Sequence, residues 1–302
     1  MKASEWIFWN VKCNYDKYFG KKDAAQEPNY LNHVQVRDFI EERLKAQEPF
    51  MFGKLGATES FVMRAEEFGF RAKRGKACAQ LCTWSGFFPE NQELMETFNQ
   101  TMKQALGNVD ILLRWYQPYE EYFVKKYANE LKGVCGWLNA WASDAPWSKA
   151  LKGKKVLVIH PFAESIQSQY KRREKIFVNQ EILPEFDLKT LKAVQTIGGE
   201  KDDRFSDWFD ALQYMCEEAM KIDFDIALIG CGAYGFPLAS YIKKHGKSAM
   251  HLGGDLQMLF GILGKRWEGR EDVSRLRNEY WVYPSESEKP KGFSKVEGGC
   301  YW

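Results

Sequence analysis

Residues 224–254 read FDIALIGCGAYGFPLASYIKKHGKSAMHLGG, and this stretch decides the fold class. FDIALIG is a continuous apolar run typical of a buried strand, a glycine-rich turn follows it, and the next residues have a helical composition. SAMHLGG then predicts a second buried strand. Two apolar strands joined through a turn and a helix are typical of a parallel sheet with helices on both faces.

Alternating strand and helix patterns continue on the N-terminal side of this stretch. KVLVI (residues 155–159) is a β-branched strand pattern, and residues 204–221 place their apolar side chains on one helical face. Further strands are predicted at 49–56, 109–115 and 192–198, and further helices at 33–46, 57–69, 91–106, 118–131 and after residue 160. We therefore expect an α/β fold with a doubly wound, mostly parallel, Rossmann-like sheet.

One α/β domain over residues 33–270 accounts for these elements. Residues 1–32 precede it as an N-terminal extension, and residues 271–302 follow it as an extended tail packed on the domain. Within the domain, residues 133–153 hold glycines and a proline among three tryptophans. This segment is the candidate join between two halves.

Composition excludes several classes of protein. Basic and acidic residues number 43 and 41, and no basic stripe stands out, so we expect no nucleic-acid partner. The 7 cysteines are scattered without a CxxC pair, which is typical of free thiols in a reducing compartment. Neither a signal-peptide pattern nor an apolar run near the roughly 18 residues of a membrane span is found. A cytoplasmic protein without a membrane span is expected, and a homo-oligomer stays open.

Ligands of an open parallel sheet bind at the carboxyl ends of its strands, near the point where the strand order reverses. The residues that follow each predicted strand are therefore the candidate site. They are Gly56, Thr58 and Glu59; His160 and Pro161; Gly230, Gly232, Tyr234 and Gly235; and Gly253, Gly254, Asp255 and Gln257.

His160 and His251 stand at equivalent strand ends. A lone histidine is more often a core residue with its hydrogen bonds satisfied than a functional group. Two of the 4 histidines at one sheet edge make a functional role as plausible as a packing role.

Gly230 to Gly235 fit the pattern GxGxxG, which follows a strand and opens a helix. Glycines there allow backbone amides to approach a phosphate at a helix N-terminus. A nicotinamide-dependent oxidoreductase is the minor interpretation, because only one clear strand follows, that strand lacks an acidic residue for a ribose, and Pro237 lies in the first helical turns. A phosphate-binding turn of another kind is favoured.

Two charged stretches need separate interpretations. Asp223-Phe224-Asp225 spells the DxD of many sugar transferases, but it precedes its strand, which predicts a solvated turn at the amino edge. Lys265 and Arg266 follow a short apolar helix at 256–263. They either neutralise a diphosphate, with Arg266 binding it bidentately, or stabilise the carboxyl end of that helix.

Three stretches resemble a known family. HPFAESIQSQY (160–170), the block from FDIALIG to GKRW (224–267) and the ending GGCYW (298–302) are similar to the GT-D-like family, bacterial proteins often associated with surface-polysaccharide genes. The resemblance runs from about Phe50 to the C-terminus. It implies a GT-D-type fold and a glycosyltransferase that moves a sugar from a nucleotide-sugar donor to a glycan or lipid-linked acceptor. Polysaccharide or glycoconjugate synthesis would be its setting.

The resemblance also implies a D-x-E metal motif after an early strand. Glu59 matches the final acidic residue, but Ala57 stands where the aspartate is expected. A single carboxylate holds a hard divalent cation less well than a pair does, so Mn²⁺ or Mg²⁺ binding at Glu59 is expected to be weak. No organic cofactor is expected. Ser165 and Gln169, within the first resembling stretch, are further candidate substrate contacts.

The resulting hypothesis places the donor diphosphate over the turn at 230–235, with Lys265 and Arg266 offsetting its charge. Glu59 ligates a metal or acts as general base on the acceptor hydroxyl, and His160 or His251 orients the sugar or leaving group. Because Ala57 replaces the aspartate, a non-catalytic relative that binds a nucleotide sugar or glycan is the second hypothesis. An oxidoreductase is the third.

Overall fold

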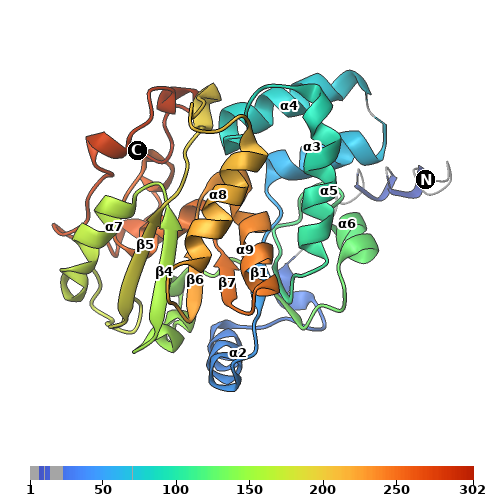
Figure 1. The fold of residues 1–302 in the computed structure, drawn as a ribbon. Coiled ribbons are helices and arrows are strands. Elements are labelled where there is room, and N and C mark those ends of the chain that lie inside the picture. The colour runs from blue at the N-terminus through green and yellow to red at the C-terminus, as the bar shows by residue number, and fades with distance from the viewer. Residues whose placement is uncertain (1–6, 10, 14–22, 70) are drawn as a thin grey trace.

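The computed structural model describes residues 7–9, 11–13, 23–69 and 71–302. Its centre is a seven-stranded sheet with the strand order β3-β2-β1-β7-β6-β4-β5, in which all neighbouring strands run parallel. The strands are β1 (Met51–Gly53), β2 (Ile111–Leu113), β3 (Gly133–Cys135), β4 (Lys155–His160), β5 (Asp187–Lys192), β6 (Ile226–Ile229) and β7 (Ser248–His251). The predicted parallel α/β sheet is therefore confirmed (Figure 1).

Helices cover both faces of the sheet. They are α2 (His33–Ala46), α3 (Ala57–Glu67), α4 (Arg71–Ser85), α5 (Met95–Leu106), α6 (Glu120–Tyr127), α7 (Ala163–Tyr170), α8 (Trp208–Met220), α9 (Gly235–Lys244), α10 (Leu256–Leu259) and α11 (Glu271–Ser274). Side-chain caps fix the starts of two of them: Asn32 accepts hydrogen bonds from the first amides of α2, and Asp207 does so for α8. Figure 1 shows α3, α5, α8 and α9 in front of the strands.

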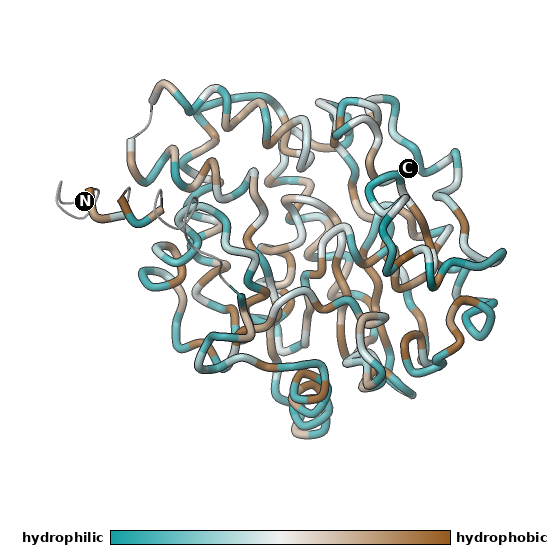
Figure 2. The backbone as a smooth tube through the Cα atoms, turned by 180° about the vertical axis from the view of Figure 1, so that it is seen from behind, coloured by the Kyte–Doolittle hydropathy of each residue, from teal (hydrophilic) through white to brown (hydrophobic). Residues whose placement is uncertain are grey.

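The core consists of two layers because successive strand side chains point to opposite faces. Met51 and Ile229 belong to the layer under α3, α4, α5, α8 and α9. Phe52 and Leu228 belong to the other layer, with α2, α7 and the segment from Leu256 onward. In Figure 2, the hydrophobic stretches gather at the centre of the molecule and the hydrophilic ones on its outer turns.

Three elements differ from the sequence prediction. The helix α4 and the short strand β3 were not predicted. The strand expected at 192–198 is wrong in position, because β5 spans Asp187–Lys192 and so ends where the predicted strand begins. β5 is an edge strand that carries three charged residues, whereas the apolar Ala193 and Val194 come after it and pack into the core.

The segment 133–153 contributes β3, which pairs with β2, and strands from both sides of the segment belong to one sheet. The C-terminal tail is packed on the domain but is not extended. Its residues form α11 and short 3₁₀ turns, and Val296, Cys300 and Trp302 are buried. Within the described parts of the chain, no helix has the length and apolar character needed to cross a membrane.

Candidate functional site

A cleft with a volume of about 480 Å³ lies at the carboxyl edge of the sheet. Residues that follow every one of the seven strands line it, because the carboxyl ends of parallel strands meet at one edge. They include Lys54 after β1, Trp115 after β2, Trp137 after β3, Pro161 after β4, Thr196 after β5, Gly230 after β6 and Gly253 after β7. The strand ends that the sequence analysis selected thus line one cavity.

The strand order reverses beneath this cleft. From β4 the chain moves outward to β5, whereas β6 and β7 lie on the other side of β4. His160 and Gly230 meet at this point, where a Cβ added to Gly230 would come within 2.8 Å of the His160 ring. The cleft therefore has the position that open α/β sheets use for ligands.

Glu59 lies in the first turn of α3 and is 6% exposed. Its Oε2 accepts a hydrogen bond from the Thr58 hydroxyl at 2.9 Å, and its carboxylate lies against the Cα of Gly56. Burial raises the pKa of Glu59, opposed by hydrogen bonds to the carboxylate and by the charge of Lys54. The carboxylate thus lies at the N-terminus of α3 in the cleft wall, where the helix dipole favours negative charge. Ala57 is exposed and lines the cleft beside it.

The end of α4 supports this wall. The hydroxyls of Thr58 and Ser85 share a hydrogen bond, so Glu59 is connected through Thr58 to α4. Thr196 is also tied to this region, because its hydroxyl lies 2.9 Å from that of Tyr234 and donates to the carbonyl of Gly86. A helix that the sequence analysis missed therefore positions a residue that it selected.

Lys54, Trp115 and Trp137 form a cluster that the sequence analysis did not identify. The Nζ of Lys54 lies 4.7 Å from the ring centroid of Trp137 and 5.7 Å from that of Trp115. The two indoles meet edge to face, and Trp115 Nε1 donates to the carbonyl of Leu55 at 2.6 Å. Each residue comes just after a strand of the N-terminal half, which is the signal that could have identified the cluster.

His160 is buried at the end of β4, and burial lowers its pKa to about 3. Its Nδ1 accepts a hydrogen bond from the backbone amide of Phe162 at 3.0 Å. The neutral ring must then carry its proton on Nε2. His160 is therefore a neutral hydrogen-bond donor at the cleft.

His251 is equally buried at the end of β7. Burial, with the nearby charge of Lys54 as a smaller cause, lowers its pKa to about 3. Its ring packs against α9, where a Cβ added to Gly235 would come within 2.6 Å of the His251 Nε2. Both histidines are consequently neutral near pH 7 and contribute no positive charge to the site.

The glycines of the GxGxxG turn are needed because neighbouring groups of the protein leave no room for a side chain at these positions. Gly232 has a φ of 58°, and a Cβ there would come within 2.6 Å of the Ser85 carbonyl oxygen. Gly235 leaves room for His251 and is not part of the cleft lining. Gly230 and Gly232 do line the cleft, so this turn forms part of its floor.

Two arginine side chains from the segment that follows α10 line the cleft. Arg266 NH1 donates to the Tyr301 hydroxyl at 2.8 Å, its guanidinium lies 4.5 Å from that ring, and it pairs with Glu297. Arg270 lines the cleft as well. Lys265 lies outside the lining, and its Nζ donates to the carbonyl of Gly298 at 3.3 Å. The predicted pair of cations is thus divided, with Arg266 alone in the cleft.

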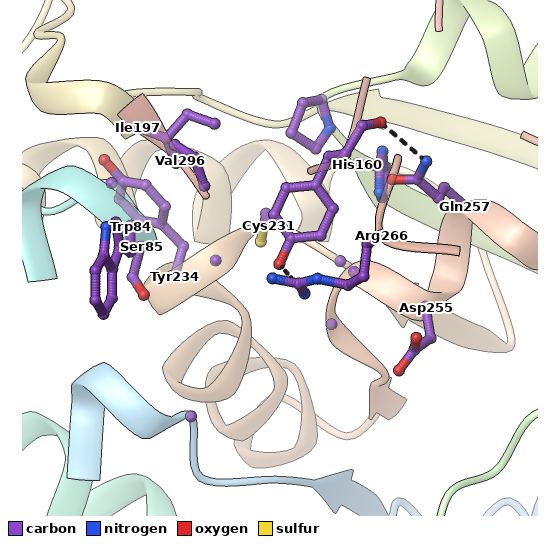
Figure 3. Close-up of a pocket in the computed structure, with 18 of the residues that line it drawn as sticks. Trp84, Ser85, His160, Ile197, Cys231, Tyr234, Asp255, Gln257, Arg266 and Val296 are labelled. Carbon is purple, nitrogen blue, oxygen red and sulfur yellow. Dashed lines mark hydrogen bonds between the residues drawn. The ribbon is translucent and has the colours of Figure 1, made fainter. Parts of the chain in front are cut away.

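Figure 3 shows that the cleft has two unlike ends. Trp84, Ser85 and Tyr234 lie at one side, and Asp255, Gln257 and Arg266 lie at the other, with His160 and Cys231 between them. Trp84 is 41% exposed, so its ring is open to a ligand.

Most candidates from the sequence come together in this cleft. They are Gly56, Thr58, Glu59, His160, Pro161, Gly230, Gly232, Tyr234, His251, Gly253, Gly254, Gln257 and Arg266. Ser165 and Gln169 lie elsewhere and hold the C-terminal segment. Ser165 hydrogen-bonds Glu288, and the amide of Gln169 donates to the carbonyls of Phe260 and Tyr280.

The acidic side chains of the cleft do not make a metal site. Within the described residues, no cluster of three or more His, Cys, Asp or Glu side chains is arranged to hold a metal ion. Glu59 accepts from Thr58, Asp255 pairs with Lys54, and Ala57 offers no ligand atom. This donor set does not fit a hard divalent cation, which prefers several oxygen ligands. Asp223 and Asp225 interact with Lys155 at the amino edge, as expected.

The comparison with protein-family models agrees with the family resemblance. The model of the family described as the GT-D fold-like domain matches residues 31–259. One similar solved structure is a selenomethionine-substituted domain of unknown function 1792, with 10% identity, a TM-score of 0.43, and 84% of this chain and 94% of that chain covered. No curated protein matches the chain.

Proposed function

The chain belongs to the GT-D-like family, and on that premise we propose that it is a glycosyltransferase that moves a sugar from a nucleotide-sugar donor to a hydroxyl of a glycan or lipid-linked acceptor. Polysaccharide or glycoconjugate synthesis is the setting of that reaction. The observation that carries the proposal is the composition of the cleft at the carboxyl edge. One cavity of about 480 Å³ combines a buried carboxylate, neutral histidines, open indole rings and cations. Its volume lies within the roughly 300–1,000 Å³ of small-molecule sites.

The donor fits the cleft with its diphosphate at the charged end. Lys54, Arg266 and Arg270 line that end, and an arginine can bind phosphate oxygens bidentately. The glycine turn at Gly230 and Gly232 would lie beneath the donor. Indole rings suit the flat base and the apolar faces of sugar rings, since stacking on an aromatic side chain contributes about 1–3 kcal/mol per base.

Glu59 is the proposed general base. The acceptor oxygen bonds to the anomeric carbon while the bond from that carbon to the phosphate oxygen breaks. The nucleotide leaves with the electron pair, and the hydroxyl proton moves to the Glu59 carboxylate. Burial raises the pKa of Glu59 above its ordinary value, which makes the ionised group a stronger base. Thr58 orients that carboxylate through its hydroxyl.

His160 is proposed to orient the donor. Its Nδ1 is occupied by the Phe162 amide, so Nε2–H is the group that remains for a sugar hydroxyl or a phosphate oxygen. His251 packs against α9, and we assign it a supporting role in holding the cleft floor. No step is routed through a metal, because the acidic side chains present do not form a site for one.

The test is a turnover assay with nucleotide sugars and glycan acceptors. The chain is incubated with UDP-, GDP- and CMP-sugars, and the released nucleotide is measured with and without acceptor. Acceptor-dependent release is the expected result. The replacement of an expected aspartate by Ala57 favours a non-catalytic relative as the second candidate, and tight binding of a nucleotide sugar without any release would establish that candidate instead.

A further inference from the structure

Lys54 is a charged group of the cleft whose surroundings confine it on several sides. Its side chain is 14% exposed, and its Nζ lies close to the rings of both Trp115 and Trp137. A Cβ added to Gly253 would come within 2.8 Å of its Cε, so the β7 end also confines it. Three neighbouring strands therefore hold one ammonium group at the wall of the cleft.

The ammonium of Lys54 is incompletely compensated. Its salt-bridge partner is Asp255, whose Oδ2 lies 3.6 Å from Nζ, longer than the roughly 2.7–3.2 Å of a hydrogen bond, and the charge of Glu59 contributes more weakly. An ammonium has three N–H donors, so it can accept further anionic partners. Burial lowers the pKa of Lys54, and the neighbouring charge of Arg266 adds to this effect. An anion that enters the cleft would offset both the burial of the ammonium and its repulsion by Arg266.

We infer that Lys54 is the cation that receives the diphosphate of the donor, so that this chain binds the anion without a divalent metal. This inference rests on the proposed function, since it takes the ligand to be a nucleotide sugar. Two observations support it independently of each other: the acidic side chains of the cleft do not form a metal site, and a confined, weakly paired ammonium faces the same cavity. As the sugar is transferred, this ammonium stabilises the negative charge that collects on the leaving diphosphate.

The test measures anion binding in EDTA by calorimetry. The probes are inorganic pyrophosphate, UDP, GDP and ADP, because pyrophosphate binding does not depend on the base. Lys54→Gln should weaken binding of pyrophosphate and of whichever nucleotide binds by about 10- to 100-fold, as expected for loss of a charge-assisted contact. Lys54→Arg should stay within about fivefold of the wild type, because it keeps the charge.

Lys103 provides the matched control. Its side chain is 11% exposed, it pairs with Glu67, and its Nζ lies 4.9 Å from the Tyr127 ring, but it does not line the cleft. Lys103→Gln therefore removes a similarly buried lysine, one with a closer carboxylate partner and no access to the cleft, and it should leave pyrophosphate affinity unchanged. Equal losses in Lys54→Gln and Lys103→Gln would overturn the inference.

Wild-type protein tests the inference even if Lys54→Gln does not fold. Pyrophosphate should bind in EDTA, and a strict requirement for Mn²⁺ would overturn the role of Lys54. Unchanged binding in a folded Lys54→Gln would also overturn it, while binding of a nucleotide sugar by that variant would leave the proposed function intact. If no probe and no nucleotide sugar binds the wild type, both fail together.

Discussion

The cleft is built from two parts of the sheet edge that differ in kind. Behind β1, β2 and β3, the lining carries reactive or open side chains, namely Glu59, Lys54, Trp115 and Trp137. At the ends of β4, β6 and β7, it carries glycines and two buried, neutral histidines, and its cations Arg266 and Arg270 come from further along the chain. The N-terminal strand ends thus offer charged and aromatic side chains to a ligand, whereas the C-terminal strand ends offer backbone and neutral rings, and cations follow them only later in the chain.

The most conspicuous sequence pattern of the cleft is therefore not the part that can carry its chemistry. The GxGxxG turn dominates the sequence, yet Gly232 and Gly235 are required by Ser85 and His251 inside the protein. Lys54, Trp115 and Trp137, by contrast, follow their strands without any recognisable pattern. A glycine motif can therefore locate a cleft correctly because of packing alone.

The largest expected effect comes from Glu59→Gln. If Glu59 is the general base, the change should lower kcat by about 10²–10⁴ in a glycosyl-transfer assay. Glu66→Gln is the matched control, since Glu66 lies on the same helix, pairs with Arg74, has a pKa that burial also raises, and does not line the cleft. Near wild-type turnover in Glu59→Gln would show that Glu59 is not the general base, and the N-terminal strand ends would then lack the catalytic role proposed for them.

The same variant has a stability signature. A carboxyl whose pKa is raised in the folded state stabilises the fold at low pH and loses that contribution as pH rises from about 4.5 through the raised pKa. Urea unfolding of the wild type should therefore show a decline over this range that Glu59→Gln lacks. An identical pH dependence in both proteins would contradict the burial of this carboxyl.

Gly232→Ala should destabilise the fold by about 2–4 kcal/mol. The alanine would need a left-handed backbone and would approach the Ser85 carbonyl, and overpacking alone costs about 1–3 kcal/mol. Gly246→Ala is the control, because Gly246 has a φ of 81° but no atom within 4 Å of an added Cβ. Equal unfolding free energies for the two variants would show that close packing does not explain the turn.

The buried histidines should make the protein acid-sensitive. Their pKa values are about 3 in the folded state against 6.5 ordinarily, so the unfolded state takes up protons first and stability falls as pH drops from about 6.5 towards 3. Each histidine should lower the free energy of unfolding by about 2–3 kcal/mol between pH 7 and pH 4.5. Unfolding of His251→Asn should show a shallower decline, whereas His245→Asn, at an exposed position, should follow the wild type.

Trp137→Ala is expected to have the smallest effect. Loss of a stacking surface should weaken nucleotide-sugar binding by about 1–2 kcal/mol, measured by calorimetry, while stability stays near that of the wild type because Trp137 is 52% exposed. Tyr283→Ala removes a ring of 42% exposure outside the cleft and should not change affinity. If both variants bind the nucleotide sugar as tightly as each other, Trp137 does not provide a stacking surface for the ligand.

Much of the fold follows from local patterns. Continuous apolar runs predicted β4, β6 and β7, because strands covered on both faces need apolar side chains throughout. β3 has only three residues, and α4 begins with a basic stretch that contains Gly75 and has little amphipathic periodicity. β5 was misplaced because an edge strand is not required to be apolar. Such elements are determined by tertiary packing rather than by their own sequence.

The candidate site was predictable in position but less so in composition. Strand ends identified Glu59 and His160 because parallel topology brings them to one edge. Lys54 was missed because its surroundings come from β2, β3 and β7, which only the folded sheet brings together. Gln169 was selected within a resembling stretch, but it holds the C-terminal segment through three backbone carbonyls.

A thermal unfolding screen with UDP-, GDP- and CMP-sugars and with NADH, each in EDTA and in Mn²⁺, tests whether this cleft binds a nucleotide sugar. A ligand at about a hundred times its dissociation constant stabilises the fold by about 2.7 kcal/mol, which is readily measured. We predict stabilisation by a nucleotide sugar, and the shift should persist in EDTA. Stabilisation by NADH alone, or by none of these compounds, would contradict the account.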